Sequence, residues 1–277
     1  MVKSAVYLLA GHERYLKEKA INDLRSSLLD HSSGELDFKS RKIEKKDTNV
    51  LEGLKEGFKY SFGFPPIRFI LLLLCVISIM GTSYAVLMPV FAKDVLGGGP
   101  STLGFLMSAG GIGALAATVY LASRRSIVGM GKLIPIASAV FSVALIAFSV
   151  SRTLWVSLII LAAAGFGLMT NMAVSNTILQ TISEDALRGR VMSFYTMALI
   201  GTTPFGSLIA GSLAGRIGAS NTIIIGGVSC LAASLIFSFK LPVIRKLIHP
   251  IYKKMGIIPE VASGLGSATR LRVPPED

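Results

Sequence analysis

Six apolar stretches of about twenty residues each constrain the fold more than any other feature of this sequence. Their approximate bounds are 69–91, 102–123, 133–150, 154–179, 191–214 and 221–239. A helix needs roughly 20 predominantly apolar residues to cross the hydrocarbon core of a bilayer. Charged residues make up only 16% of the chain, and within this region they lie between the stretches. The sequence therefore predicts an all-α membrane protein with six transmembrane helices.

The basic residues of the connecting segments predict how these helices are oriented. One set of segments is rich in Lys and Arg. It consists of the N-terminal region, the loop with Arg124, Arg125 and Lys132, the loop with Arg188 and Arg190, and the segment 240–254. The alternate loops carry only Lys93, Arg152 and Arg216. Because cytoplasmic loops are enriched in Lys and Arg, both termini are predicted to be cytoplasmic. The net charge of +12 then reflects membrane orientation, and no nucleic-acid partner is expected.

The segments outside the six stretches differ from one another. In residues 1–38, a short strand at 5–10 and an amphipathic helix at 13–30 are predicted. The sequence YLLAGHERYLKEKAI at 7–21 resembles the start of the delta subunit of the bacterial DNA polymerase III clamp loader. A cytoplasmic amphipathic leader is the alternative. One strand and one helix cannot close a core, so no replication function is carried over.

Two further segments flank the membrane region. Residues 39–68 are predicted to be a cytoplasmic linker, and residues 241–277 a basic and then disordered cytoplasmic tail. Within the tail, 241–254 mixes basic and apolar residues around Pro250. This part either lies on an anionic leaflet, interrupted at Pro250, or is a simple flank of the last span.

The membrane region resembles the C-terminal half of major facilitator superfamily transporters, in the branch that includes bacterial siderophore and drug exporters. The residues that carry the resemblance are 54–68, 86–117, ISEDALRGRVMSFYTM at 182–197 and GTTPFGSLIAG at 201–211. The family has two six-helix halves that rock about a site near the middle of the membrane. The resemblance implies efflux of small molecules by alternating access, with spans one, two, four and five around the substrate and no cofactor.

On this interpretation the chain is half of a transporter, and it is expected to be inactive alone. One alternative is an active parallel homodimer, and another is a split transporter completed by a second six-span chain. A remote alternative, a membrane-anchored clamp-loader component, lacks most of that subunit. The expected partners are therefore the lipid bilayer and, in the assembled transporter, a small-molecule substrate. No nucleophile–base arrangement or buried carboxylate suggests an enzyme.

Five residues of the fourth and fifth spans, four of them polar, are the candidates for a substrate cavity. The set consists of Asn171, Asn176, Gln180, Tyr195 and Met197. For the polar face of the fourth span, hydrogen bonding between helices is the alternative, because such bonds are common between membrane helices. For Tyr195 and Met197, a position in the core or against lipid is equally compatible with the sequence.

Two more features of this region suggest moving parts. The loop residues Glu184, Asp185, Arg188 and Arg190 are predicted to form a cytoplasmic latch between the two halves, with simple topology anchoring as the alternative. Gly201, Pro204, Gly206 and Gly211 interrupt the fifth span. Since Pro removes a helical hydrogen bond and Gly allows close crossing, this span is predicted either to bend as a gate or merely to pack closely.

Overall fold

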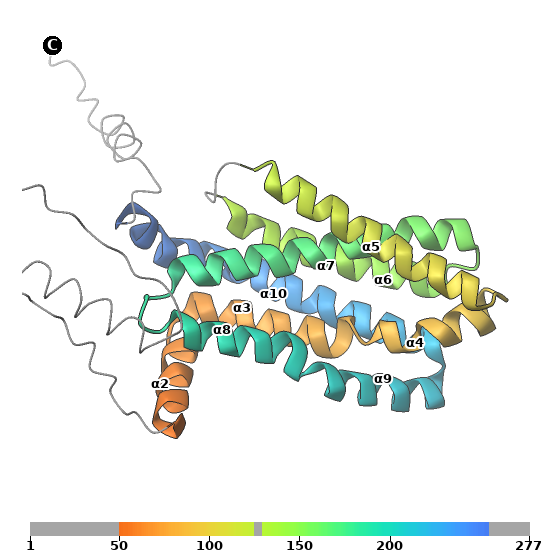
Figure 1. Ribbon diagram of the computed structural model, residues 1–277, viewed down its shortest axis with the longest axis horizontal. Helices are drawn as coiled ribbons and strands as arrows, with labels where there is room; N and C mark the ends of the chain where they lie inside the picture. The colour runs from red at the N-terminus through yellow and green to blue at the C-terminus, as the bar shows by residue number, and fades with distance from the viewer. Residues whose placement is uncertain (1–49, 125–128, 255–277) are drawn as a thin grey trace, which may run out of the picture. The chain divides into compact units, whose positions relative to one another are not determined.

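The computed structural model describes residues 50–124 and 129–254, which Figure 1 shows as helices joined by short connections. The predicted strand at 5–10, the predicted helix at 13–30 and the segment 256–277 lie outside these residues. The resemblance of residues 1–38 to a clamp-loader subunit therefore stays a prediction.

Six helical stretches of the described residues are long and apolar enough to cross a membrane. They are Pro65–Val95, Pro100–Ala122, Met130–Val150, Leu154–Ile182, Arg188–Ile217 and Ala219–Tyr252. Each overlaps one of the predicted spans. The prediction of an all-α membrane protein with six transmembrane helices is confirmed.

Two of the spans are interrupted by π-helical turns. The first consists of α3 (Pro65–Val76), the π turn η1 (Ile77–Gly81), α4 (Tyr84–Val90) and a second π turn, η2 (Phe91–Val95). The fifth consists of α8 (Arg188–Thr196), the π turn η4 (Met197–Gly201) and α9 (Thr203–Ile217). The other spans are α5 (Pro100–Ala122), α6 (Leu133–Val150) after the 3-10 turn η3 (Met130–Lys132), α7 (Leu154–Ile182) and α10 (Ala219–Lys254).

The helix α2 (Val50–Gly63) occupies part of the predicted linker and meets α3 at a steep angle in Figure 1. It ends just before Pro65, which stands in the first turn of α3, where a missing N–H is tolerated. α2 packs on the start of α8: the rings of Phe58 and Phe194 lie 6.1 Å apart, and Gly57 lies against the side chain of Arg190. The part of the linker that follows Val50 is thus a helix attached to the bundle.

The sixth span does not stop at Phe239, as the sequence predicted, and Pro250 does not interrupt it. α10 continues as one helix through Pro242 and Pro250 to Lys254. Beyond Phe239 its buried residues are Ile244, Ile248 and Tyr252, which recur every four residues. This spacing keeps one apolar face against the bundle after the first charged residues appear, and tertiary packing of that face sustains the helix.

Glycines set the closest helix crossings. A Cβ at Gly113 of α5 would collide with the Ala162 carbonyl of α7, and a Cβ at Gly165 of α7 would collide with the Gly110 carbonyl of α5. On the other side of α7, Gly167 lies against the backbone of Ala137 and Phe141 in α6. Small residues let membrane helices approach closely. As a result α7 runs between α5 and α6 along most of its length.

Candidate functional site

A hollow of about 290 Å³ lies between the first, second and fourth spans. We call it the methionine hollow because four methionines line it: Met88, Met107, Met169 and Met172. The remaining lining residues are small or apolar, apart from one tyrosine: Tyr84, Ala85, Leu106, Gly110, Gly111, Ala114, Gly165 and Leu168. Methionine is flexible and polarizable, so such a surface can adapt to irregular apolar ligands.

The α7 helix contributes a continuous stripe to this hollow and beyond it. Gly165, Met169, Met172, Asn176 and Gln180 follow one another at intervals of three or four residues, which places them on one face of the helix. Gln180 Nε2 donates to Asn176 Oδ1. The predicted cavity residues Asn176 and Gln180 thus extend the face that carries the methionines beyond the hollow, which neither of them lines.

Asn171 lies on the opposite face of α7, toward α6. Its side chain is fully buried, and Nδ2 donates to Ser138 Oγ at 2.6 Å and to the Ile134 carbonyl at 3.3 Å. Ser138 is itself buried and donates to the same carbonyl. This geometry matches the alternative of hydrogen bonding between helices, and it separates Asn171 from the methionine hollow.

Tyr195 and Met197 of the fifth span differ in their surroundings. Tyr195 is buried, and its hydroxyl donates to the Met172 carbonyl at 3.1 Å, which joins α8 to the stripe on α7. The Met197 side chain is 56% exposed and lines a shallow surface hollow with Met192 and Ile200. The structure therefore brings Tyr195 beside the stripe and leaves Met197 on an open face of the bundle.

The fifth span is broken where the sequence places its Gly and Pro residues. The π turn η4 ends at Gly201, and Pro204 stands in the first turn of α9. Gly206 lies against the backbone of Ile79 in the first span, whereas Gly211 has open space around it. The break and one close crossing are thus observed, and the gating role stays a prediction.

The two π turns η1 and η4 are linked directly. Ser78 Oγ donates to the Leu199 carbonyl at 2.6 Å, and it lies 3.3 Å from Thr203 Oγ1. π turns inside helices often occur at functional sites. Here the irregular parts of the first and fifth spans contact each other directly.

Both arginines of the predicted latch have partners within this bundle. Arg188 pairs with Asp185 at 2.5 Å and donates through Nε to the Gln180 carbonyl at 3.0 Å. Arg190 pairs with Glu56 of α2 at 2.5 Å. The Glu184 backbone N–H donates to the Tyr60 hydroxyl at 3.2 Å. The loop is therefore bound to α2 by an ion pair and a hydrogen bond. Its predicted role as a latch to a second half stays a prediction.

The Glu56–Arg190 pair is expected to contribute little to stability. Both side chains are partly exposed, and exposed ion pairs contribute about 0.2–1 kcal/mol. A double-mutant cycle with Glu56→Gln and Arg190→Gln, followed by thermal unfolding in uncharged detergent, should give a coupling energy in this range that falls as salt is added. A coupling energy above about 2 kcal/mol would contradict this expectation and would show that the ion pair, rather than apolar packing, holds α2 on the bundle.

None of the residues predicted for a substrate cavity lines the methionine hollow. Met169 and Met172 stand three residues apart near Asn176, and this spacing was a usable signal. Met88 and Met107 had none, because they come from α4 and α5, which only tertiary packing brings beside α7. All the predicted cavity residues except Met197 were polar, whereas the hollow is mainly apolar.

Comparison with known proteins now identifies the class of this bundle. The profile of a family described as transmembrane secretion effectors, a branch of the major facilitator superfamily, matches residues 37–255. The "Staphyloferrin A transporter" of Staphylococcus aureus (strain NCTC 8325 / PS 47) is 28% identical over 159 residues, which are 57% of this chain and 40% of that protein. No solved structure matches the chain.

The matched family and the staphylococcal relative are transport proteins, which agrees with the expectation that the chain is not an enzyme. The chain aligns with well under two thirds of the length of the staphylococcal relative. The six apolar helices and the family together make it a multi-pass membrane protein. The chain belongs to the transmembrane secretion effector family of major facilitator transporters.

Proposed function

We propose that this chain exports small amphipathic molecules across a bacterial inner membrane by alternating access, with both termini in the cytoplasm. The methionine hollow and the stripe that leads to Asn176 and Gln180 are its contribution to the substrate path. The observation that carries the proposal is that the α7 residues of this apolar hollow and the polar pair Asn176 and Gln180 follow one another on one face of α7. Ligand sites are commonly apolar with a few placed polar groups.

A second six-helix bundle is part of the proposal. Substrate sites of this superfamily lie between two halves related by an axis along the membrane normal, and the described residues supply one bundle. We propose that the bundle alone does not transport and that a second bundle completes the site. The second bundle could instead be another copy of this chain. The two halves of this superfamily have the same orientation in the membrane, so two parallel copies would match that arrangement.

The apolar faces of α5 and α9 support this arrangement. Phe105, Ile112 and Val119 of α5 and Phe205 and Leu208 of α9 are all more than half exposed. Some of this surface faces lipid in any membrane protein, so exposure alone does not identify a partner. Phe105 and Ile112 line a separate hollow with Trp155 and Ile159 of α7, whereas Met107, on another side of α5 and 63% exposed, lines the methionine hollow.

Transport and its direction are tested in membrane vesicles. Everted vesicles that contain the full chain together with a second six-span bundle should accumulate an exported probe, and vesicles with the chain alone should not. Suitable probes are ethidium and staphyloferrin A, the latter because the relative's name specifies it. Accumulation only in right-side-out vesicles would overturn export in favour of import. Accumulation by the chain alone at a dilution that keeps it monomeric would overturn the requirement for a second bundle.

Filling the methionine hollow should block substrate binding without unfolding the bundle. Gly111 lines the hollow, and a Cβ there would meet nothing within 4 Å, so Gly111→Leu projects a side chain into open space. Losing an apolar subsite of this kind should weaken binding of a fluorescent amphiphile by about 10–200-fold, the effect of roughly 1–3 kcal/mol. Fluorescence titration of the purified full chain measures it.

Gly104→Leu is the matched control. Gly104 stands on the same helix, also has open space around it, and does not line the hollow. This variant should bind the amphiphile like the wild type. Equal binding by both variants would remove the hollow from the proposed path.

A further inference from the structure

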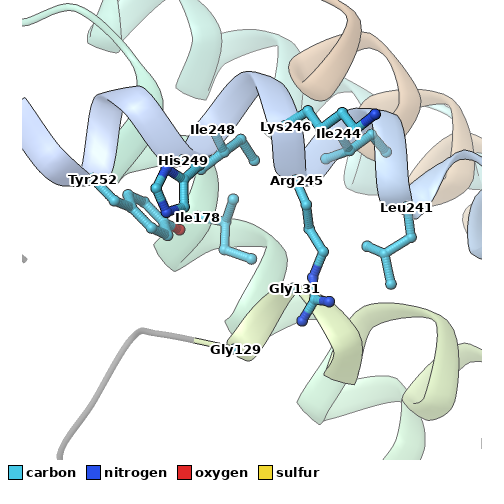
Figure 2. A pocket seen from close by; sticks show the side chains of 10 residues that line it. All are labelled: Gly129, Gly131, Ile178, Leu241, Ile244, Arg245, Lys246, Ile248, His249 and Tyr252. Carbon is cyan, nitrogen blue, oxygen red and sulfur yellow. The ribbon is translucent and has the colours of Figure 1, made fainter. Parts of the chain in front are cut away.

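A second pocket, of about 400 Å³, lies at the end of the bundle where α10 extends beyond Phe239. Figure 2 shows it between the extension of α10, the η3 turn and α7. Its volume falls within the range of roughly 300–1,000 Å³ that small-molecule sites occupy. It shares no lining residue with the methionine hollow, so the proposed substrate path does not use it.

The walls of this pocket are apolar. Ile178 of α7 faces Leu241, Ile244 and Ile248 of α10, and the ring of Tyr252 lies at one end. Gly131 of η3 contributes backbone alone on the opposite side. A slot of this kind suits a hydrocarbon chain, since burying apolar surface is favourable at about 25 cal/mol per Å².

Basic side chains stand at the same pocket. The Arg245 side chain extends from α10 toward Gly131, and His249 lies beside Tyr252 one turn further along (Figure 2). Within the described residues, Arg245 and Lys246 form no ion pair. Glu184 and Asp185 line a different hollow, together with Tyr60 and Ile251. The pocket therefore offers an uncompensated positive charge next to an apolar slot.

The length of α10 places this pocket at the membrane boundary. Its 36 residues span about 54 Å, whereas the hydrocarbon core is only about 30 Å thick. The helix carries no charged residue from Ala219 to Phe239, and its basic residues begin at Lys240. Arg245 and His249 then lie at the level of the lipid head groups, and Leu241 and Ile244 lie nearer the acyl chains.

We propose that this pocket binds an anionic phospholipid. The acyl chain lies along Leu241 and Ile244, on the membrane side of Arg245, and the phosphate is bound by Arg245, with His249 as a second donor. Charge complementarity selects an anion, and the apolar wall selects a ligand with a hydrocarbon chain over a free phosphate. The bilayer supplies such a ligand at this depth. The pocket lies between α10, η3 and α7, so a bound lipid would contact all three elements.

Lipid titration of the purified full chain tests the proposal. Native mass spectrometry in uncharged detergent counts bound phosphatidylglycerol and phosphatidylcholine of identical acyl chains. The wild type should retain phosphatidylglycerol at lower lipid concentration. Arg245→Gln should weaken this binding about five-fold, the effect of one basic residue near an anionic lipid. Lys240→Gln, on the same helix but outside the pocket, should change it less than about two-fold.

A pocket-filling variant tests the slot independently of charge. A Cβ at Gly131 would meet only Leu241 Cδ1, at 4.0 Å, so Gly131→Leu fills the pocket without a collision. It should weaken binding of phosphatidylglycerol while leaving every charge in place. Unchanged binding in Gly131→Leu, or equal losses in Arg245→Gln and Lys240→Gln, would overturn the proposal in favour of general attraction to the basic surface. Competition by millimolar glycerol 3-phosphate would identify a soluble anion site and also overturn it.

Discussion

Gly113→Leu is expected to prevent the bundle from folding normally. The α5 and α7 backbones touch at Gly113, where a Cβ would overlap the carbonyl carbon and oxygen of Ala162 and the backbone nitrogen of Phe166. Backbone atoms cannot move aside as a flexible side chain does, so the two helices must separate along their crossing. Overpacking typically costs 1–3 kcal/mol, and a helix displacement should exceed about 3 kcal/mol. Size-exclusion chromatography and thermal unfolding in detergent should show little folded protein.

Gly104→Leu again serves as the comparison, because it adds the same side chain to the same helix in open space. It should unfold at the temperature of the wild type. Three glycines of α5 are thus expected to give three different results on substitution by Leu. Gly104 should tolerate the change, Gly111 should lose ligand binding, and Gly113 should lose the fold. A well-folded Gly113→Leu protein would show that the α5–α7 crossing is looser than described.

Phe141→Ala is expected to produce the largest loss of stability among the buried side chains. Phe141 of α6 is fully buried, and its ring lies against Gly81 at the end of η1 and meets the ring of Tyr84 at 6.3 Å. Its backbone also lies against Gly167 of α7. Removing the ring leaves a cavity among three spans, and Phe-to-Ala changes in cores cost about 3–5 kcal/mol. Equilibrium unfolding in mixed micelles measures this loss.

Val143→Ala is the matched control on α6. The Val143 side chain is 54% exposed, so its truncation leaves no internal cavity. Surface substitutions of this kind usually change the free energy of unfolding by less than about 0.5 kcal/mol. A Phe141→Ala loss no larger than the Val143→Ala loss would mean that the spans close around the missing ring.

The candidate site was only partly predictable from sequence. Asn171 and Asn176 are the same residue type on the same helix, five positions apart, and both were expected at a cavity. In the structure Asn171 bonds to Ser138 of α6, whereas Asn176 lies on the face of α7 that continues from Met172. Nothing in a single helix distinguishes its two polar faces, because the neighbours that contact each face are supplied by other parts of the chain.

The same limit explains the sixth span. Charge and Pro residues after Phe239 predicted a separate tail, yet α10 continues because Ile244, Ile248 and Tyr252 are buried against the bundle. Hydropathy measures the tendency of a segment to leave water. It does not show whether the rest of the protein offers a surface on which an amphipathic helix can pack. The extent of α10, and with it the lipid pocket, depends on that surface.

The sequence by itself determined the number of membrane spans, their approximate positions and the helical class. These depend on the length and polarity of local segments compared with the thickness of a bilayer, which no tertiary contact alters. Only the tertiary structure decided which face of α7 meets α6 and which continues the methionine hollow, and which glycines permit close crossings. Those outcomes depend on the backbone of one helix meeting the surface of another, and residues far apart in the sequence supply that contact.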